Sequence, residues 1–136
     1  MAYLLDKKLC TGVNDFFQRI FTEEHALGFP KFPTIAEVIN VIHAAGGVAI
    51  CAHAASGFHG PGLDNVINLL RPESFDGFEC YHSNHTEADT KRLRQHCLKH
   101  GLMITGGSDC HGTFVPGRFL GQPEVQLENI CLPLLK

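Results

Sequence analysis

The segment Val48-Ala-Ile-Cys-Ala-His53 decides the predicted fold of this chain. It is apolar on both alternating faces, a pattern typical of a parallel strand that is covered on both sides. Gly46 and Gly47 precede it and favour the left-handed backbone that ends a helix. A histidine therefore stands where a buried strand is predicted to end.

Two further apolar runs end in polar residues. The run from Phe78 to Tyr81 leads into His82, and the run that starts at Leu102 leads into Asp109. Apolar residues at helical spacing lie between the runs, and one such helix begins with the capping box Thr34-Ile-Ala-Glu37. The alternation predicts an α/β fold with mainly parallel strands and flanking helices, which gathers functional residues at the C-terminal strand ends.

Composition narrows the class of protein. The 136 residues suit a single domain over 1–136, but a complete (β/α)₈ barrel needs about 250. The hydrophobic content of 44% and charged content of 18% are typical of a globular protein. A net charge of −3 gives no case for duplex nucleic acid as a partner. No apolar run approaches the length of a membrane span and no leader is seen, so we expect a soluble, cytoplasmic protein.

The six cysteines contain no Cys-x-x-Cys pair. We interpret them as reduced thiols that pack as small hydrophobic side chains.

Asp109 and His111 carry the strongest chemical signal. In an extended segment, residues i and i+2 face the same way, so a carboxylate and an imidazole would converge at the strand end. Such ligands suit a divalent transition metal. The alternative is an Asp–His hydrogen bond without a metal. His53 taken alone is either a metal ligand or a structural histidine, and the neighbouring clusters favour a ligand.

The second strand end is less clear. If the strand stays regular, Glu79 and Tyr81 share one face and His82 takes the other, so a bend is needed for Glu79 and His82 to meet. His85 could reach a substrate anion. Lys31 and Arg118 lie in loops rich in proline and glycine, where each either holds a phosphate or is a solvated surface residue.

Three blocks in order resemble the PHP family (polymerase and histidinol phosphatase), especially its TrpH/YciV-like metal-dependent phosphoesterases. They are Gly46-Gly-Val-Ala-Ile-Cys-Ala-His53, Asp76-Gly-Phe-Glu-Cys-Tyr-His82 and Thr105-Gly-Gly-Ser-Asp-Cys-His-Gly112. The resemblance covers residues 29–121. Two positions differ from the family pattern, because Ala54 replaces a proline and Cys110 a phenylalanine.

The resemblance implies a (β/α)₇-type barrel with a site for Mn, Zn or Fe at the C-terminal rim. It implies metal-ligand roles for His53, Asp109 and His111, with Asp109 and His111 taking part in catalysis. The residues with an implied substrate-side role, together with the two loop cations above, are Glu79, Tyr81, His82, His85, Lys31 and Arg118.

One part of the family pattern has no counterpart. The N-terminal His-x-His motif and the ligands that follow it are absent, so the chain resembles the C-terminal part of a PHP barrel. An incomplete barrel exposes strand edges and apolar surface. We therefore expect a homodimer or a complementing chain to cover them.

Two functions follow as hypotheses. The first is a metal-dependent phosphoesterase that hydrolyses a small phosphorylated metabolite or a nucleotide and is incomplete as this chain. The alternative is a non-catalytic metal-binding or complementing module that needs a second chain. Whether the chain is an enzyme by itself stays open, because half of the family's metal ligands are missing.

Overall fold

The structure is a computed structural model that describes residues 1–71, 73–115 and 117–133, and the chain forms two compact units, residues 1–33 and 34–136. That these units make one domain stays a prediction. The N-terminal unit contains short helical segments only: α1 (Ala2–Asp6), α2 (Val13–Asp15), the π-helix Phe16–Ile20 and the 3₁₀-helix Glu23–His25.

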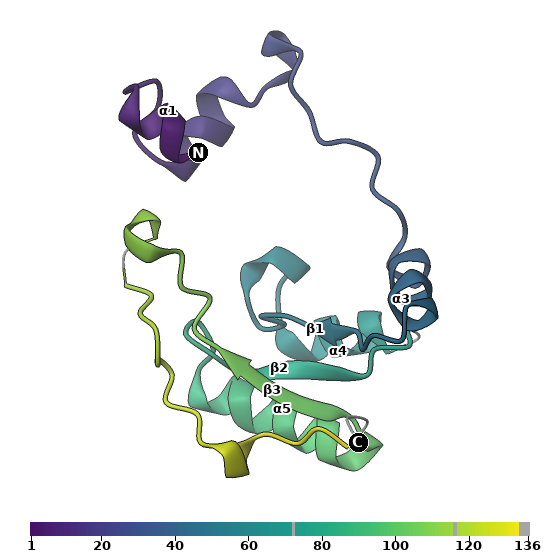
Figure 1. Ribbon diagram of the computed structural model, residues 1–136. Helices are drawn as coiled ribbons and strands as arrows, with labels where there is room; N and C mark the ends of the chain where they lie inside the picture. Colours follow the sequence, from purple (N-terminus) through teal and green to yellow (C-terminus); the bar gives the residue numbers. More distant parts are fainter. Residues whose placement is uncertain (72, 116, 134–136) are drawn as a thin grey trace. The chain divides into compact units, whose positions relative to one another are not determined.

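The C-terminal unit is built on a three-stranded parallel sheet in the order β1-β2-β3, with β1 (Ile50–Cys51), β2 (Gly77–His82) and β3 (Met103–Gly107). Figure 1 shows β2 between the other two strands. The predicted parallel α/β arrangement is therefore confirmed. The first strand is shorter than the sequence pattern suggests, because the amide of Ala49 donates to the side chain of Asp76 at 2.6 Å.

Helix α3 (Ile35–Ala44) leads into β1, α4 (Leu63–Leu70) connects β1 to β2, and α5 (Glu87–His100) connects β2 to β3. The predicted capping box at Thr34 is present, and α5 begins with an equivalent box in which Thr86 and Asp89 satisfy each other's backbone amides. Gly101 ends α5 in the left-handed conformation, with a φ of 67°.

The core lies between the sheet and the helices α4 and α5. Figure 1 shows α5 running alongside β2 and β3, and these elements are in contact. Leu93 and Cys97 of α5 are fully buried. One buried cluster joins residues of all three strands with both helices: Cys51, Ala54, Val66, Ile67, Leu70, Phe78, Cys80, Leu93, Cys97 and Ile104.

The cysteines behave in part as expected. All six are free, and Cys10, Cys51, Cys80 and Cys97 are buried, whereas Cys110 is half-buried and Cys131 is exposed. Burial raises the pKa of the Cys51 thiol to about 11, which keeps it protonated.

The rest of the C-terminal unit consists of loops and short helical turns. They include the 3₁₀-helices Gly57–His59, Gly112–Phe114 and Leu127–Asn129. Cys131 forms an antiparallel bridge to Ile104, so this segment lies beside the free edge of β3. No helix within the described ranges is long and apolar enough to cross a membrane.

Candidate functional site

The candidate site lies where the three parallel strands end. His53 follows β1, His82 is the last residue of β2, and Asp109 follows β3. The rings of His53 and His82 are 5.7 Å apart between centroids, and His82 Nε2 lies 3.5 Å from Asp109 Oδ2. The structure therefore brings together side chains that are separated by more than fifty residues in sequence.

Two of these residues have an unusual backbone. His53 and Asp109 have φ angles of 36° and 49°, in the left-handed region that residues with a side chain rarely adopt. Such conformations cost energy and persist only where the surroundings impose them, often at functional sites. Each turns the chain sharply at a strand end and directs a polar side chain to the shared edge.

An irregularity in β2 sets the position of Glu79. In the pairing with β3, Glu79 stands opposite Thr105 but Tyr81 stands opposite Gly106, so the register shifts between them. Glu79 Oε2 accepts the amide of His53 at 2.8 Å. A Cβ at Gly107 would lie 2.6 Å from Glu79 Oε1, so a larger residue there would displace this carboxylate.

The negative charge of Glu79 acts to raise the pKa of the His82 imidazole. Burial is nevertheless the stronger influence, and it lowers the pKa of His82 against the opposing effects of Glu79 and Asp109. His82 is 3% exposed and therefore sits as a neutral ring.

The hydrogen bonds of His82 fix its tautomer. Nδ1 accepts the amide of Asn84 at 3.1 Å, so the hydrogen of the neutral ring is on Nε2. Nε2 is buried and has no hydrogen-bond partner within the described part of the chain. The 3.5 Å separation from Asp109 is an ion-pair distance and too long for a good hydrogen bond. His82 thus presents an N–H donor, not a lone pair for a metal.

His85 uses both ring nitrogens on the backbone. Nδ1 donates to the carbonyl of Cys80 at 3.1 Å, and Nε2 accepts the amide of Ala55 at 3.2 Å. The ring therefore ties the loop after β1 to the end of β2. Its predicted reach to a substrate anion stays a prediction, and the observed contacts are those of a residue that positions the site.

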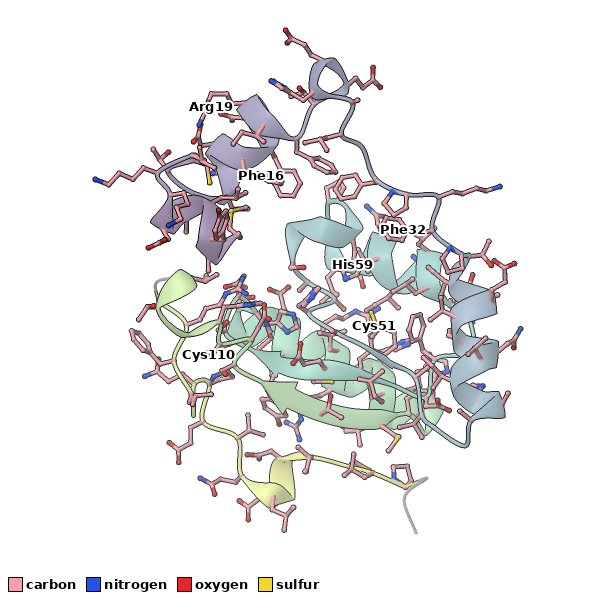
Figure 2. All side chains as sticks on the ribbon, turned by 45° about the horizontal axis from the view of Figure 1, so that its top comes forward. Phe16, Arg19, Phe32, Cys51, His59 and Cys110 are labelled. Carbon is pink, nitrogen blue, oxygen red and sulfur yellow. The ribbon has the colours of Figure 1, made fainter. Side chains whose placement is uncertain are left out.

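The loop after β1 contributes one residue that the sequence left undecided. His59, labelled in Figure 2, stacks on His53 with 5.5 Å between ring centroids and donates from Nε2 to the carbonyl of Ala52 at 3.2 Å. Ser56 lies 3.3 Å from His53 Nδ1. The loop thus folds back over His53. No local sequence pattern predicts these contacts, because they join residues through the fold of the loop.

Asp109 is the centre of the polar cluster. His111 Nε2 is 3.0 Å from Oδ1, and Arg118 Nη1 donates to Oδ2. Burial acts to raise the pKa of Asp109, but the positive charge of Arg118, the hydrogen bond with His111 and the proximity of His82 outweigh it and hold that pKa below its usual range. Asp109 therefore stays a carboxylate at neutral pH.

Some of the predicted site residues lie at the cluster around Asp109 and others do not. Of the two loop cations, Arg118 contacts Asp109, and Lys31 is exposed and belongs to the N-terminal unit. Tyr81 is half-buried, and the guanidinium of Arg94 on α5 lies over its ring at 5.8 Å from the centroid. Arg94 was not predicted, because it is one of several charged residues on this helix and no local pattern distinguishes it.

The ligand types at the strand ends fit a divalent transition metal, but their arrangement is incomplete. Among the residues that the structure describes, no three His, Cys, Asp or Glu side chains form a group that could hold a metal ion. Around Asp109, Arg118 occupies one carboxylate oxygen and His82 presents a hydrogen. Asp109 and His111 do point toward each other, as predicted.

Comparisons with known proteins agree with this chemistry. The chain is 34% identical over 82 residues to a phosphoribosyl 1,2-cyclic phosphate 1,2-diphosphodiesterase of Eggerthella lenta, which covers 57% of this chain and 28% of the relative. It is 29% identical over 105 residues to a 3′,5′-nucleoside bisphosphate phosphatase of Chromobacterium violaceum. This alignment covers 76% of this chain and 36% of that protein. No protein-family profile matches the chain.

Two solved structures share the fold. A candidate metal-dependent phosphoesterase from Bifidobacterium adolescentis superposes with a TM-score of 0.67 at 28% identity, over 88% of this chain and 42% of that one. A Chromobacterium violaceum amidohydrolase with bound sulfate gives a TM-score of 0.59 at 24% identity, with the same coverage. The predicted fold class, part of a PHP-type α/β barrel, is confirmed.

The chain spans about a third of the length of the named relatives it matches. In sequence and in fold the chain is similar to PHP-type phosphoesterases and corresponds to a part of their length.

Proposed function

We propose that this chain contributes to a metal-dependent phosphoesterase that hydrolyses a small phosphorylated metabolite or a nucleotide. The observation that carries the proposal is the cluster around Asp109, where an ionised carboxylate meets His82, His111 and Arg118 at the end of adjacent parallel strands. The relatives named above act on a cyclic phosphate and on a nucleoside bisphosphate, which supports a phosphate ester as the substrate class.

Within this proposal, His53, Asp109 and His111 supply part of the ligand set for Mn, Zn or Fe, and Asp109 and His111 serve the reaction. The imidazole and carboxylate donors accept any of these metals. A bound divalent ion would supply positive charge for the phosphoryl oxygens. Further ligands have to come from outside the described residues, since no group of three converges among them.

The remaining site residues would bind or position the substrate. Arg118 offers a guanidinium beside Asp109 that suits a phosphate oxygen. His82 offers its buried N–H, and Tyr81 borders the same space. Glu79 holds the backbone of His53 in place. The phosphate-binding role of Lys31 and the substrate contact of His85 belong to the proposal as predictions.

A second candidate is a non-catalytic module whose site is completed by another chain. The incomplete ligand set favours it, and so does the short strand β1, which has no hydrogen-bonded neighbour on its outer side among the described strands. The partner would be a second copy or a different chain that supplies strands and ligands. A strictly monomeric protein in analytical ultracentrifugation would contradict the homodimer.

The test is the metal content of the chain purified without chelator, measured by elemental mass spectrometry. We expect bound metal in the natural protein and its loss in the double variant Asp109→Ala/His111→Ala. The matched control is Asp64→Ala/His100→Ala, which removes the same two residue types at exposed positions and should leave the metal unchanged.

Activity separates the two candidates. Hydrolysis of a nucleoside 3′,5′-bisphosphate that requires the metal would support a phosphoesterase complete in this chain, whereas metal binding without turnover would support the complementing module. Absence of metal from the natural protein and the control alike would refute both.

A further inference from the structure

A cavity of about 570 Å³ lies between the end of β2 and the first half of α5. Its lining includes two site residues, Tyr81 and His82, and two cations of α5, Lys91 and Arg94. Nothing in the phosphoesterase proposal so far uses Lys91 or Arg94. The cavity is large enough for a phosphate-sized group and borders the cluster around Asp109 through His82.

Two buried polar side-chain atoms without a hydrogen-bond partner are found in the described part of the chain, and both belong to residues of this lining. They are Arg94 Nε and His82 Nε2. A guanidinium can only donate, and the tautomer of His82 puts a hydrogen on Nε2. A buried donor without an acceptor destabilises the folded state, so each of the two atoms indicates a missing acceptor.

The charge of the lining favours an anionic ligand, as the unpaired donors do. Lys91 and Arg94 contribute two positive charges and Glu87 one negative charge. The Arg94 guanidinium rests over the ring of Tyr81, which fixes its plane. Asp109 near His82 would repel an anion, but Arg118 lies against that carboxylate and offsets its charge.

We propose that this cavity binds an oxyanion of the phosphate class, with Arg94 as its principal donor and Lys91 as a second positive charge. The oxygens of such a group accept the hydrogens that Arg94 Nε and His82 Nε2 leave unpaired. The assignment of the oxyanion to a phosphate group of the substrate rests on the proposed function. Arg94 then determines specificity for an anionic group.

The experiment titrates the 136-residue chain with inorganic phosphate by NMR in the presence of a chelator, so that no metal contributes. We expect chemical-shift changes at Tyr81 and Arg94 and about tenfold weaker binding for Arg94→Ala, equivalent to loss of one charge-assisted hydrogen bond. The matched control is Arg92→Ala. Arg92 lies on the same helix, is exposed, and pairs with Asp64 at 2.7 Å outside this cavity.

A second variant covers the case in which Arg94→Ala fails to fold. Lys91 is exposed, so Lys91→Ala should fold and still weaken phosphate binding several-fold. Unchanged binding in Lys91→Ala and Arg94→Ala would overturn the inference. So would equal weakening by Arg92→Ala, which would show attraction by overall charge, or equally tight binding of acetate, which would assign the site to carboxylates.

Failure of this inference is distinct from failure of the phosphoesterase proposal. Phosphate binding through Arg94 without any metal binding would keep the oxyanion site and refute the metal-dependent function. Metal binding through Asp109, with phosphate binding unchanged in Arg94→Ala, would keep the metal-dependent function and refute the oxyanion site.

Discussion

Asp76 joins the elements that carry the site, and its removal gives the sharpest test of the fold. It directly precedes β2, and one carboxylate oxygen accepts both the amide of Ala49 at 2.6 Å and Nε2 of His43 at 2.7 Å. Its backbone exchanges further hydrogen bonds with Ala49 and Met103. The side chain therefore fixes the connection from α3 to β1 against the start of β2.

The expected cost of Asp76→Ala follows from these contacts. Ala49 is 3% exposed, so its amide would lose its side-chain partner in a buried setting, at about 2 kcal/mol. The pair with His43 adds about 0.5 kcal/mol, because the His43 side chain is 37% exposed and solvent screens the interaction. We therefore expect Asp76→Ala to lower the free energy of unfolding by about 2.5 kcal/mol in total.

The effect should depend on pH with a defined sign. Burial acts to raise the pKa of Asp76, but the hydrogen bonds from Ala49 and His43 and the charge of His43 prevail and lower it. The unfolded carboxyl has a pKa near about 3.9, so the stabilisation is fully present above about pH 4. It is lost as the pH falls through the lower pKa of the folded state.

The assay is urea unfolding followed by circular dichroism at about pH 7 and about pH 3. The control is Asp64→Ala, which breaks an exposed ion pair with Arg92 and should cost about 0.5 kcal/mol. The reasoning is refuted if Asp76→Ala costs no more than the control at neutral pH. It is also refuted if the difference in free energy of unfolding between the natural protein and Asp76→Ala is as large at about pH 3 as at about pH 7.

Three further substitutions test the packing around the site. Leu93→Ala should lower the free energy of unfolding by about 3 kcal/mol in urea titrations, because Leu93 is fully buried. Leu98 is exposed on the same helix, so Leu98→Ala should lower it by less than about 0.5 kcal/mol. Similar losses in the two variants would contradict the assigned core. Gly77→Ala places a Cβ 2.5 Å from the Met103 carbonyl, so thermal unfolding should show a loss of about 1–3 kcal/mol, and an unchanged midpoint would contradict the close strand pairing. Thr86→Ala removes the cap of α5 and should cost about 1 kcal/mol by chemical denaturation, whereas Thr86→Ser should restore most of it.

Much of the fold followed from short-range patterns. The apolar run before His53 predicted a buried parallel strand, and the capping box at Thr34 predicted where α3 begins. Alternation of strands and helices placed His53, His82 and Asp109 at one edge, since right-handed crossovers leave parallel strand ends together. Asp109 and His111 pair as expected, but the left-handed backbone at Asp109 brings them together and not the extended i, i+2 geometry from which the pairing was predicted.

Other features depended on residues far apart in sequence. The register shift opposite Gly106 decides that Glu79 reaches His53, and no local pattern encodes a register between strands. The tautomer of His82 depends on how the chain turns back at Asn84.

The sequence by itself determined the parallel α/β class, the strand ends and the residue types gathered there, because strand and helix periodicities and caps act over a few residues. Only the tertiary structure decided which nitrogen of His82 donates, that both nitrogens of His85 are held by backbone, and that Arg94 lies over Tyr81. These are consequences of packing between distant segments, where hydrogen-bond partners are chosen by three-dimensional distance and burial.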